Sequence, residues 1–299
     1  MKPLVECVPN FSEGRRKDVV EAIAAAIAAV PGVRVLDRTM DADHNRSVIT
    51  FVGAPEAALF GAFAGAQTAV RLIDMEAHTG EHPRVGAMDV CPFIPIASVT
   101  LDDCVALARR LGDRVATELG VPVFFYEAAA TRPERKALPD VRKGEYEGLK
   151  AEIATNPTRA PDVGPPRMHP TAGATIIGAR PPLIAYNVNL ATSDLGVAKK
   201  IAKIIRERDG GLHAVRALGM DLKDRGMVQV SINLVDYRKT PPHVVFEAVR
   251  KEAAKLGVEV AGSEVVGLVP LEAIVMAAGQ ALKLEHFTAD QVLEARLND

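Results

Sequence analysis

Tryptophan is absent from this sequence, and aromatic residues together make up only 4% of its 299 positions. Hydrophobic residues still account for 48%, so we expect one large or two small domains with a core of Ala, Val, Leu and Ile. No apolar run reaches the ~20 residues that a membrane-spanning helix needs. Glu6 and Pro9 interrupt the apolar N-terminal stretch, which therefore does not resemble a signal peptide. These absences argue against a membrane protein.

The sequence also has few cysteines and almost no net charge. The three cysteines, Cys7, Cys91 and Cys104, form no CxxC motif, and such a set fits a reducing, cytoplasmic compartment. Cys91 lies in an apolar stretch ahead of Pro92, which favours core packing over nucleophilic catalysis. The 36 basic and 38 acidic side chains leave a formal charge of −2. Nothing electrostatic therefore suggests binding to nucleic acid or to an anionic membrane.

The hydrophobic pattern of the first third predicts the order strand, helix, strand, strand, helix, strand. These elements are expected at 4–8, 19–30, 33–37, 47–52, 56–73 and 86–96. Ser12 is expected to be the N-cap of the first helix. This order is the split βαβ pattern of ferredoxin-like domains. A further helix at 101–119 and a strand at 121–126 are expected to follow.

The same order of elements returns in the second half, which suggests an internal duplication. The repeated elements are expected at 183–188, 196–206, 215–218, 228–235, 242–256 and 258–269. Between the halves lies a polar, Pro-rich passage, 131–170, with one helix expected at 141–154; such a passage is typical of a functional loop or linker. We therefore predict an α/β fold of two ferredoxin-like split βαβ subdomains, 1–178 and 179–299. The helices should lie outside, and the two sheets should face each other across a cleft.

The densest group of polar residues is HTGEHPRVGAMD at 78–89, in a loop ahead of a strand. Histidine is the natural acid/base near neutral pH because its ordinary pKa is about 6.5. His82 is therefore the candidate catalytic residue, and Glu81 or Asp89 could orient it. The alternative is a solvated loop without a catalytic role.

Two patterns resemble metal sites, but neither has the residues such a site needs. His78 and His82 have the spacing of zinc ligands on a helix, but Gly80 and Pro83 make a helix there improbable. The string DADHNR at 41–46 begins like a calcium loop, yet Arg46 stands where that loop needs glycine. We predict no metal site.

Arg46 is instead a candidate for binding a substrate carboxylate, which a guanidinium group matches with two parallel hydrogen bonds. Asn10 and Asn189 end the first strand of each half and could hydrogen-bond a ligand, although asparagine there is usually a turn former. No dinucleotide-binding, Walker A or G-x-S-x-G motif is present. The basic residues around the central passage are expected to form a solvated face or to steer an anionic substrate: Arg132, Arg135, Lys136, Arg142 and Lys143.

Several long strings point to a known family. They include VPNFSEG at 8–14, NRSVITFVG at 45–53, EAHTGEHPRVGAMD at 76–89 and GATIIGARPPLIAYNVNL at 173–190. Over essentially its whole length the sequence resembles glutamate formimidoyltransferases, including the transferase half of bifunctional formimidoyltransferase-cyclodeaminases. No cyclodeaminase domain follows, so we expect that second activity to be absent.

The resemblance implies two similar α/β subdomains with folate in a tunnel between them, and a homodimer. It also implies that the histidine of GEHPR, His82 here, is the catalytic residue. The family's folate-contacting stretch falls on Val163, Gly164, Pro165, Pro166, Arg167, Met168, His169, Pro170, Thr171 and Ala172. Of these, Gly164, Pro165 and Pro170 match the family pattern, and the others differ from the animal members.

The activity implied is transfer of a formimidoyl group between N-formimidoyl-L-glutamate and N5 of tetrahydrofolate, in histidine degradation and one-carbon metabolism. Tetrahydrofolate would be the co-substrate, and no metal, nucleic acid or membrane partner is expected. Two alternatives stay open. The chain could handle a formyl group, from 5-formyltetrahydrofolate or N-formylglutamate, or it could be a non-catalytic folate-binding module.

Overall fold

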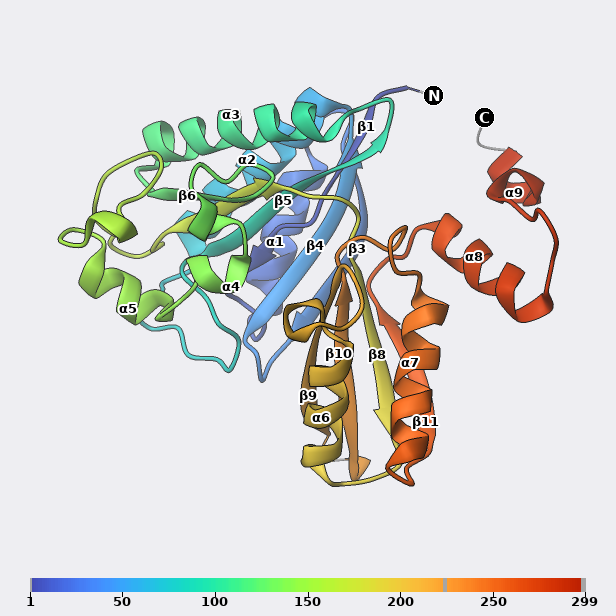
Figure 1. Cartoon of the computed structure of the whole chain (residues 1–299). Helices are drawn as coiled ribbons and strands as arrows, with labels where there is room; N and C mark the ends of the chain where they lie inside the picture. The colour runs from blue at the N-terminus through green and yellow to red at the C-terminus, as the bar shows by residue number, and fades with distance from the viewer. Residues whose placement is uncertain (1, 223–224, 297–299) are drawn as a thin grey trace. The chain divides into compact units, whose positions relative to one another are not determined.

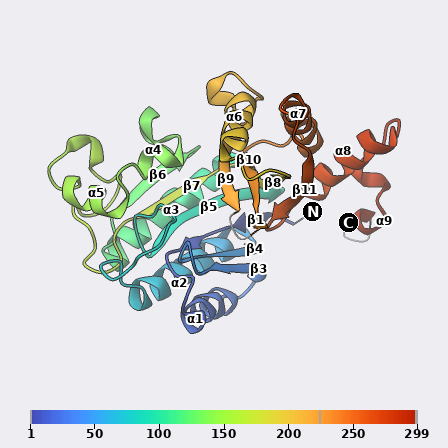
Figure 2. The same cartoon turned by 90° about the horizontal axis from the view of Figure 1, so that it is seen from below.

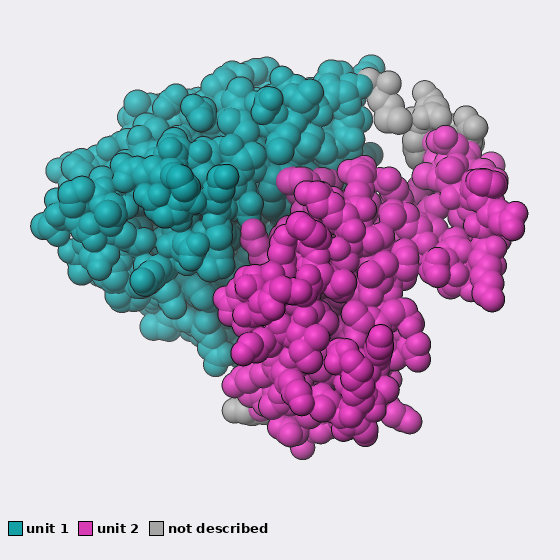
Figure 3. All heavy atoms as spheres, viewed as in Figure 1, with its two compact units in different colours: residues 1–180 teal, residues 181–299 magenta. Residues whose placement is uncertain are grey.

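The computed structural model describes residues 2–222 and 225–296, which divide between two compact units, 1–180 and 181–299 (Figures 1 and 3). Each unit has its own sheet and its own buried core. The α/β class with two split βαβ units, predicted from the sequence, is confirmed. The subdomain boundary at residue 178 and the facing of the two sheets stay predictions.

The first unit contains the predicted order and then extends it. Its elements are β1 (Leu4–Cys7), β2 (Asn10–Phe11), α1 (Lys17–Ala28), β3 (Arg34–Asp41), β4 (Arg46–Gly53), α2 (Pro55–Leu72), β5 (Met88–Ala97), α3 (Leu101–Leu119), β6 (Val123–Glu127), α4 (Leu138–Val141), α5 (Glu145–Glu152) and β7 (Thr175–Ala179). β1 and β2 lie between β4 and β5, and β3 borders β4; all these pairings are antiparallel. β7 lies between β5 and β6 and runs parallel to both.

The two faces of the first sheet are covered by different helices, as alternation of side chains along a strand requires. Phe125 and Ile177 belong to the main core, which α1, α2 and α3 cover. Their neighbours Phe124 and Ile176 belong to a second cluster, which α4 and α5 cover from the opposite face. Figure 2 shows α4 and α5 on the other side of the sheet from α1 and α2.

Local signals explain where the helix predictions were right or wrong. The helix expected at 101–119 is confirmed as α3, because Thr100 forms a capping box and Gly120 ends the helix in the left-handed region. The helix expected at 141–154 is the shorter α5, which begins only after the left-handed Gly144, with φ of 80°; α4 ends at Val141, where the expected helix was to begin. The prediction that Ser12 caps α1 is wrong. The hydroxyl of Ser12 instead donates to the carbonyl of Gly86 at 2.8 Å.

The second unit repeats the four-stranded pattern without the extension. Its elements are β8 (Ile184–Leu190), α6 (Leu195–Ile205), β9 (Val215–Leu222), β10 (Met227–Leu234), α7 (Pro242–Lys255), β11 (Val260–Val266), α8 (Leu271–Leu282) and α9 (Leu293–Arg296). The strand order β11-β8-β10-β9 corresponds to β5-β1-β4-β3 in the first unit. Within the described ranges, no helix is both long and apolar enough to cross a membrane.

Candidate functional site

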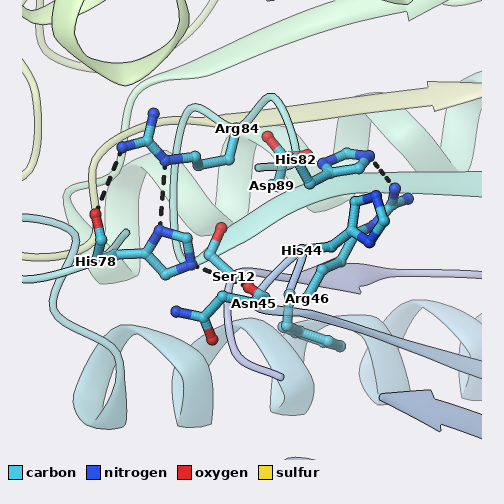
Figure 4. A pocket seen from close by; sticks show the side chains of 9 residues that line it. Ser12, His44, Asn45, Arg46, His78, His82, Arg84 and Asp89 are labelled. Carbon is cyan, nitrogen blue, oxygen red and sulfur yellow. Dashed lines mark hydrogen bonds between the residues drawn. The ribbon is translucent and has the colours of Figure 1, made fainter. Parts of the chain in front are cut away.

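A small polar hollow in the first unit gathers residues from three loops (Figure 4). One loop follows β2, one joins β3 to β4, and one precedes β5. The space between the lining atoms amounts to about 170 Å³, a figure that includes open solvent. Its lining residues are Phe11, Ser12, His44, Asn45, Arg46, His78, His82, Arg84 and Asp89. The fold thus brings together the two strings DADHNR and HTGEHPR, which lie more than thirty residues apart.

Asn45 fastens the three loops to one another. It sits at a φ of 46° in the turn between β3 and β4, a conformation that asparagine tolerates better than most residues. Its Oδ1 accepts from the amide of Gly14 at 2.9 Å, and its Nδ2 donates to the carbonyl of Thr79 at 2.9 Å. Its own carbonyl lies 3.0 Å from Nε2 of His78. The position of the next residue, Arg46, is therefore fixed by its neighbours.

His78 and Arg84 form a fully partnered pair on one side of the hollow. Nε of Arg84 donates to Nδ1 of His78 at 3.3 Å, so Nε2 of that ring carries the proton and donates to Asn45. Burial lowers the pKa of His78, which favours this neutral form. Arg84 binds Glu147 through both terminal nitrogens, at 2.9 and 2.6 Å, and Glu145 at 3.1 Å. These contacts tie the loop before β5 to helix α5.

His82 and Arg46 form a second pair on the other side. Nη1 of Arg46 contacts Nε2 of His82, and because a guanidinium can only donate, that ring nitrogen must be the acceptor. The ring is therefore neutral, with its proton on Nδ1. Burial, followed by the charges of Arg46 and Arg142, lowers the pKa of His82 to about 2. The imidazole is thus in the form that a general base requires.

Asp89 partners an arginine rather than His82. Its Oδ1 accepts from the amide of Val85 at 2.8 Å, and its Oδ2 pairs with Arg142. Asp89 is 2% exposed, so this ion pair is nearly dry. The expectation that Arg142 and Arg135 belong to a solvated face was wrong, because both side chains are largely buried and Arg135 forms an ion pair with Asp162 at 2.5 Å.

Sequence reasoning missed His44, Asn45 and Ser12 as members of the site. The ring of His44 lies edge-on to that of His82, with 6.2 Å between centroids, and pairs with Asp41 at 3.0 Å. The polar string DADHNR was the available signal, but only Arg46 was singled out from it. No group of three or more side chains able to hold a metal occurs in the part of the chain that the structure describes.

Asn10 and Asn189 lie in different units, and each is hydrogen-bonded inside its own. Nδ2 of Asn10 donates to the carbonyl of Val8 at 2.7 Å. Oδ1 of Asn189 accepts from Gln229 at 2.8 Å. Both side chains are buried, and Asn10 does not line the hollow, although its neighbour Phe11 does. A ligand-binding role for either asparagine stays a prediction.

The segment 163–172 runs beside the starts of β5, β6 and β7. Val163 bridges to Val123 at the start of β6. Met168 packs against the main core and the second cluster of the first unit. Nδ1 of His169 accepts from the amide of Ala172 at 3.0 Å. The carbonyl of Ala172 then accepts from the amide of Ala87 at 2.9 Å. This last bond connects the segment to the loop that carries His82.

Comparison with known proteins gives matches along nearly the whole chain. Residues 4–180 match the formiminotransferase domain, N-terminal subdomain, and residues 185–294 match the formiminotransferase domain. A glutamate formimidoyltransferase of Thermoplasma acidophilum is 52% identical over 98% of this chain and 97% of its own length. One from Streptococcus pyogenes serotype M1 is 46% identical over 99% of both chains. A formimidoyltransferase-cyclodeaminase of Gallus gallus is 47% identical over 95% of this chain but 53% of its own length.

Proposed function

This chain belongs to the formiminotransferase family, and on that premise we propose that it transfers a formimidoyl group between N-formimidoyl-L-glutamate and N5 of tetrahydrofolate. The observation that carries this proposal is the identity of 46–52% to two glutamate formimidoyltransferases over nearly the full length of the chain. The hollow that holds His82 supports it, because the reaction needs an acid/base rather than a redox group.

The chemistry requires one proton to move. When N-formimidoylglutamate is consumed, N5 of tetrahydrofolate attacks the amidine carbon and a C–N5 bond forms. The bond from that carbon to the glutamate nitrogen then breaks. N5 loses its proton and the glutamate nitrogen gains one, so a single group that takes and returns a proton balances the reaction. We assign this role to His82, whose ring is neutral and carries its proton on Nδ1.

Binding of two substrates in line supplies the rest of the catalysis. Positioning of this kind can lower a barrier by roughly 7 kcal/mol or more in good cases. We assign folate binding to the segment 163–172, which is hydrogen-bonded through Ala172 to Ala87 in the loop that carries His82. Arg46 is the candidate for a substrate carboxylate, and Asn10 is a further candidate contact. This reaction needs no metal.

We also infer that the enzyme is a cytoplasmic homodimer and that residues 1–178 and 179–299 act as its N-terminal and C-terminal subdomains. The three cysteines support a reducing compartment, because all are free and buried. Size-exclusion chromatography with light scattering tests the dimer: a mass of twice the 31.9 kDa of the chain is expected. A single-chain mass at micromolar concentration would contradict it.

The activity is tested by measuring formimidoyl transfer from N-formimidoylglutamate to tetrahydrofolate with wild type and His82→Ala. We expect turnover by wild type and a loss of about a hundredfold or more in the variant, the usual effect of losing a general acid/base. His213→Ala is the matched control, since that histidine's side chain is 80% exposed in the second unit.

Each other outcome points elsewhere. Equal rates for wild type and His82→Ala would remove His82 from the mechanism. Turnover with 5-formyltetrahydrofolate alone would indicate the formyl-group enzyme. Folate binding without turnover of either donor would indicate the binding module.

A further inference from the structure

Arg46 differs from three other arginines that the first unit largely buries. Each of those is paired with a carboxylate, in the pairs Arg84–Glu147, Arg135–Asp162 and Arg142–Asp89. Among the described residues, Arg46 forms no ion pair with a carboxylate. Its Nη1 contacts the neutral ring of His82, and its Nε is buried without a hydrogen-bond partner. The guanidinium is therefore a cation that lacks a counter-ion.

A largely buried charge without a partner is costly, so its persistence requires an explanation. Burial, helped by the nearby charge of Arg142, lowers the pKa of Arg46 to about 10, and Asp89 and Asp41 only partly oppose this. Asp89 is already engaged by Arg142. The hollow thus holds more positive than negative charge and opens to solvent, so it can complete the pairing only with an anion from outside.

The shape of the available donors selects the class of anion. A guanidinium offers adjacent N–H groups in one plane, which match the two oxygens of a carboxylate. The buried Nε and the Nη1 that now contacts His82 belong to this planar group. The N–H of Nε lies side by side with an N–H of Nη2, so a carboxylate can bind these two donors while Nη1 stays on His82.

We propose that Arg46 binds a carboxylate of the amino-acid substrate through Nε, and that the negative charge brought to the guanidinium makes the neighbouring His82 a stronger base for the reaction's proton. The inference rests on the proposed function for the role of His82. The carboxylate site itself rests only on the surroundings of Arg46.

The proposal couples substrate binding to the basicity of His82. In the structure, the ring is faced by Arg46 from β4, Arg142 from the end of α4 and His44 from the β3–β4 turn. Burial, and then the charges of the two arginines, keep the ring in its unprotonated form. A bound carboxylate neutralises the charge of Arg46, so the pKa of His82 rises toward its ordinary value. The base then becomes available when the substrate is in place.

The coupling can be measured without turnover. The ring protons of His82 are followed by NMR between pH 5 and 8, with and without glutarate, a dicarboxylate that has no amine to react. In wild type we expect a ring that stays neutral over this range, and one that titrates within it when glutarate is bound. In Arg46→Gln the ring should be more protonated at pH 5 than in wild type without glutarate, and adding glutarate should not change this. Failure of glutarate to bind, or binding that leaves the His82 signal unchanged, would overturn the proposal.

Kinetics give a second, independent test. Losing a hydrogen-bonded charge pair should raise the KM for N-formimidoylglutamate about 10- to 100-fold in Arg46→Gln. Arg46→Lys keeps the charge without the planar pair of donors and covers the case in which the glutamine variant does not fold; we expect a smaller rise. Arg110→Gln is the matched control, because that arginine's side chain is 52% exposed in a surface ion pair with Glu56.

The two proposals fail in distinguishable ways. Transfer by wild type, with an unchanged KM in both Arg46 variants, would overturn the role of Arg46 and leave the function intact. No transfer by wild type, with a glutarate-dependent titration of His82, would overturn the proposed function and support the carboxylate site.

Discussion

The hollow contains two histidine–arginine pairs that differ in how completely they are partnered. In the pair His78–Arg84, the two ring nitrogens have partners and the arginine binds two glutamates. In the pair His82–Arg46, the arginine has a neutral ring as its partner and an unsatisfied Nε. The residue types are the same, but Arg84 shares the loop before β5 with both histidines, whereas Arg46 begins β4.

The difference teaches how to separate a structural pair from a functional one. A network with every donor and acceptor satisfied stabilises the fold, since its buried polar groups cost nothing further. A network with a missing counter-ion lowers the stability of the fold, and such a cost is typical of ligand-binding sites. On this criterion the HTGEHPR loop is held in place by His78 and Arg84, and it presents His82 to the hollow.

The largest loss of stability is expected from a substitution at Gly14, whose amide binds Asn45 and so supports the loops that carry both pairs. A Cβ there would meet the carbonyl of Asp41 at 2.1 Å and the amide of Arg46 at 2.4 Å, and backbone cannot move aside cheaply. Gly14→Ala should lower the free energy of unfolding by about 3 kcal/mol or more and displace Arg46. Urea unfolding measures this, and Gly148→Ala is the control. That glycine is helical with no atom within 4 Å of an added Cβ, so it should be neutral or gain about 0.5–1 kcal/mol.

Breaking only the satisfied pair should mainly cost stability. Arg84→Gln removes the contacts to Glu147 and Glu145 and leaves Nδ1 of His78 without its donor. We expect a loss of about 1–3 kcal/mol, at the lower end because both glutamates are substantially exposed. Thermal unfolding measures it. An unchanged Tm would show that the pair does not hold the loop.

The free energy of unfolding should decrease at acid pH because His78 and His82 are neutral in the folded state. The pKa values of His78 and His82 are lowered in the folded state, so below about pH 6.5 the unfolded chain takes up protons that the folded chain does not. The stability present above that pH is lost as the pH falls, by up to about 1.4 kcal/mol per pH unit for each histidine. Urea unfolding between pH 7.5 and 5 should give a smaller slope for His82→Gln than for wild type. Equal slopes would contradict the burial of a neutral His82.

The smallest effect on stability is expected at the unsatisfied pair. Arg46→Gln removes a largely buried cation that has no carboxylate partner, so the free energy of unfolding should stay within about 1 kcal/mol of wild type or rise. Calorimetry of both proteins measures this. A loss larger than that for Arg84→Gln would reverse the comparison and assign Arg46 a structural role.

The sequence predicts the parts of this molecule that depend on local signals. The bounds of α3 follow from Thr100 and Gly120, which act within one turn of the helix ends. The two split βαβ orders follow from alternating and helical hydrophobic periods, and their repetition in the second half points to the same result. His82 could be predicted as a catalytic candidate because histidine is the side chain whose ordinary pKa suits acid/base catalysis near neutral pH.

What the sequence did not predict depends on contacts between distant residues. Arg142 lies in a run of basic residues and looked solvated, yet it reaches Asp89, 53 positions away, in a nearly dry ion pair. β7 was not expected as a strand, because its short stretch Thr175–Ala179 has no alternation; a parallel strand buried on both faces needs none. The unsatisfied state of Arg46 is likewise a property of its surroundings and not of its neighbours in sequence.

The late insertion of β7 has a consequence for biosynthesis. β6 has no partner other than β7 among the strands described, and β7 ends at Ala179, at the last residues of the first unit. A nascent chain that has emerged only as far as residue 170 carries β6 as an unpaired edge and lacks the bond from Ala87 to Ala172. The first unit, although encoded first, can therefore close its sheet and set its hollow only after its last residues have left the ribosome.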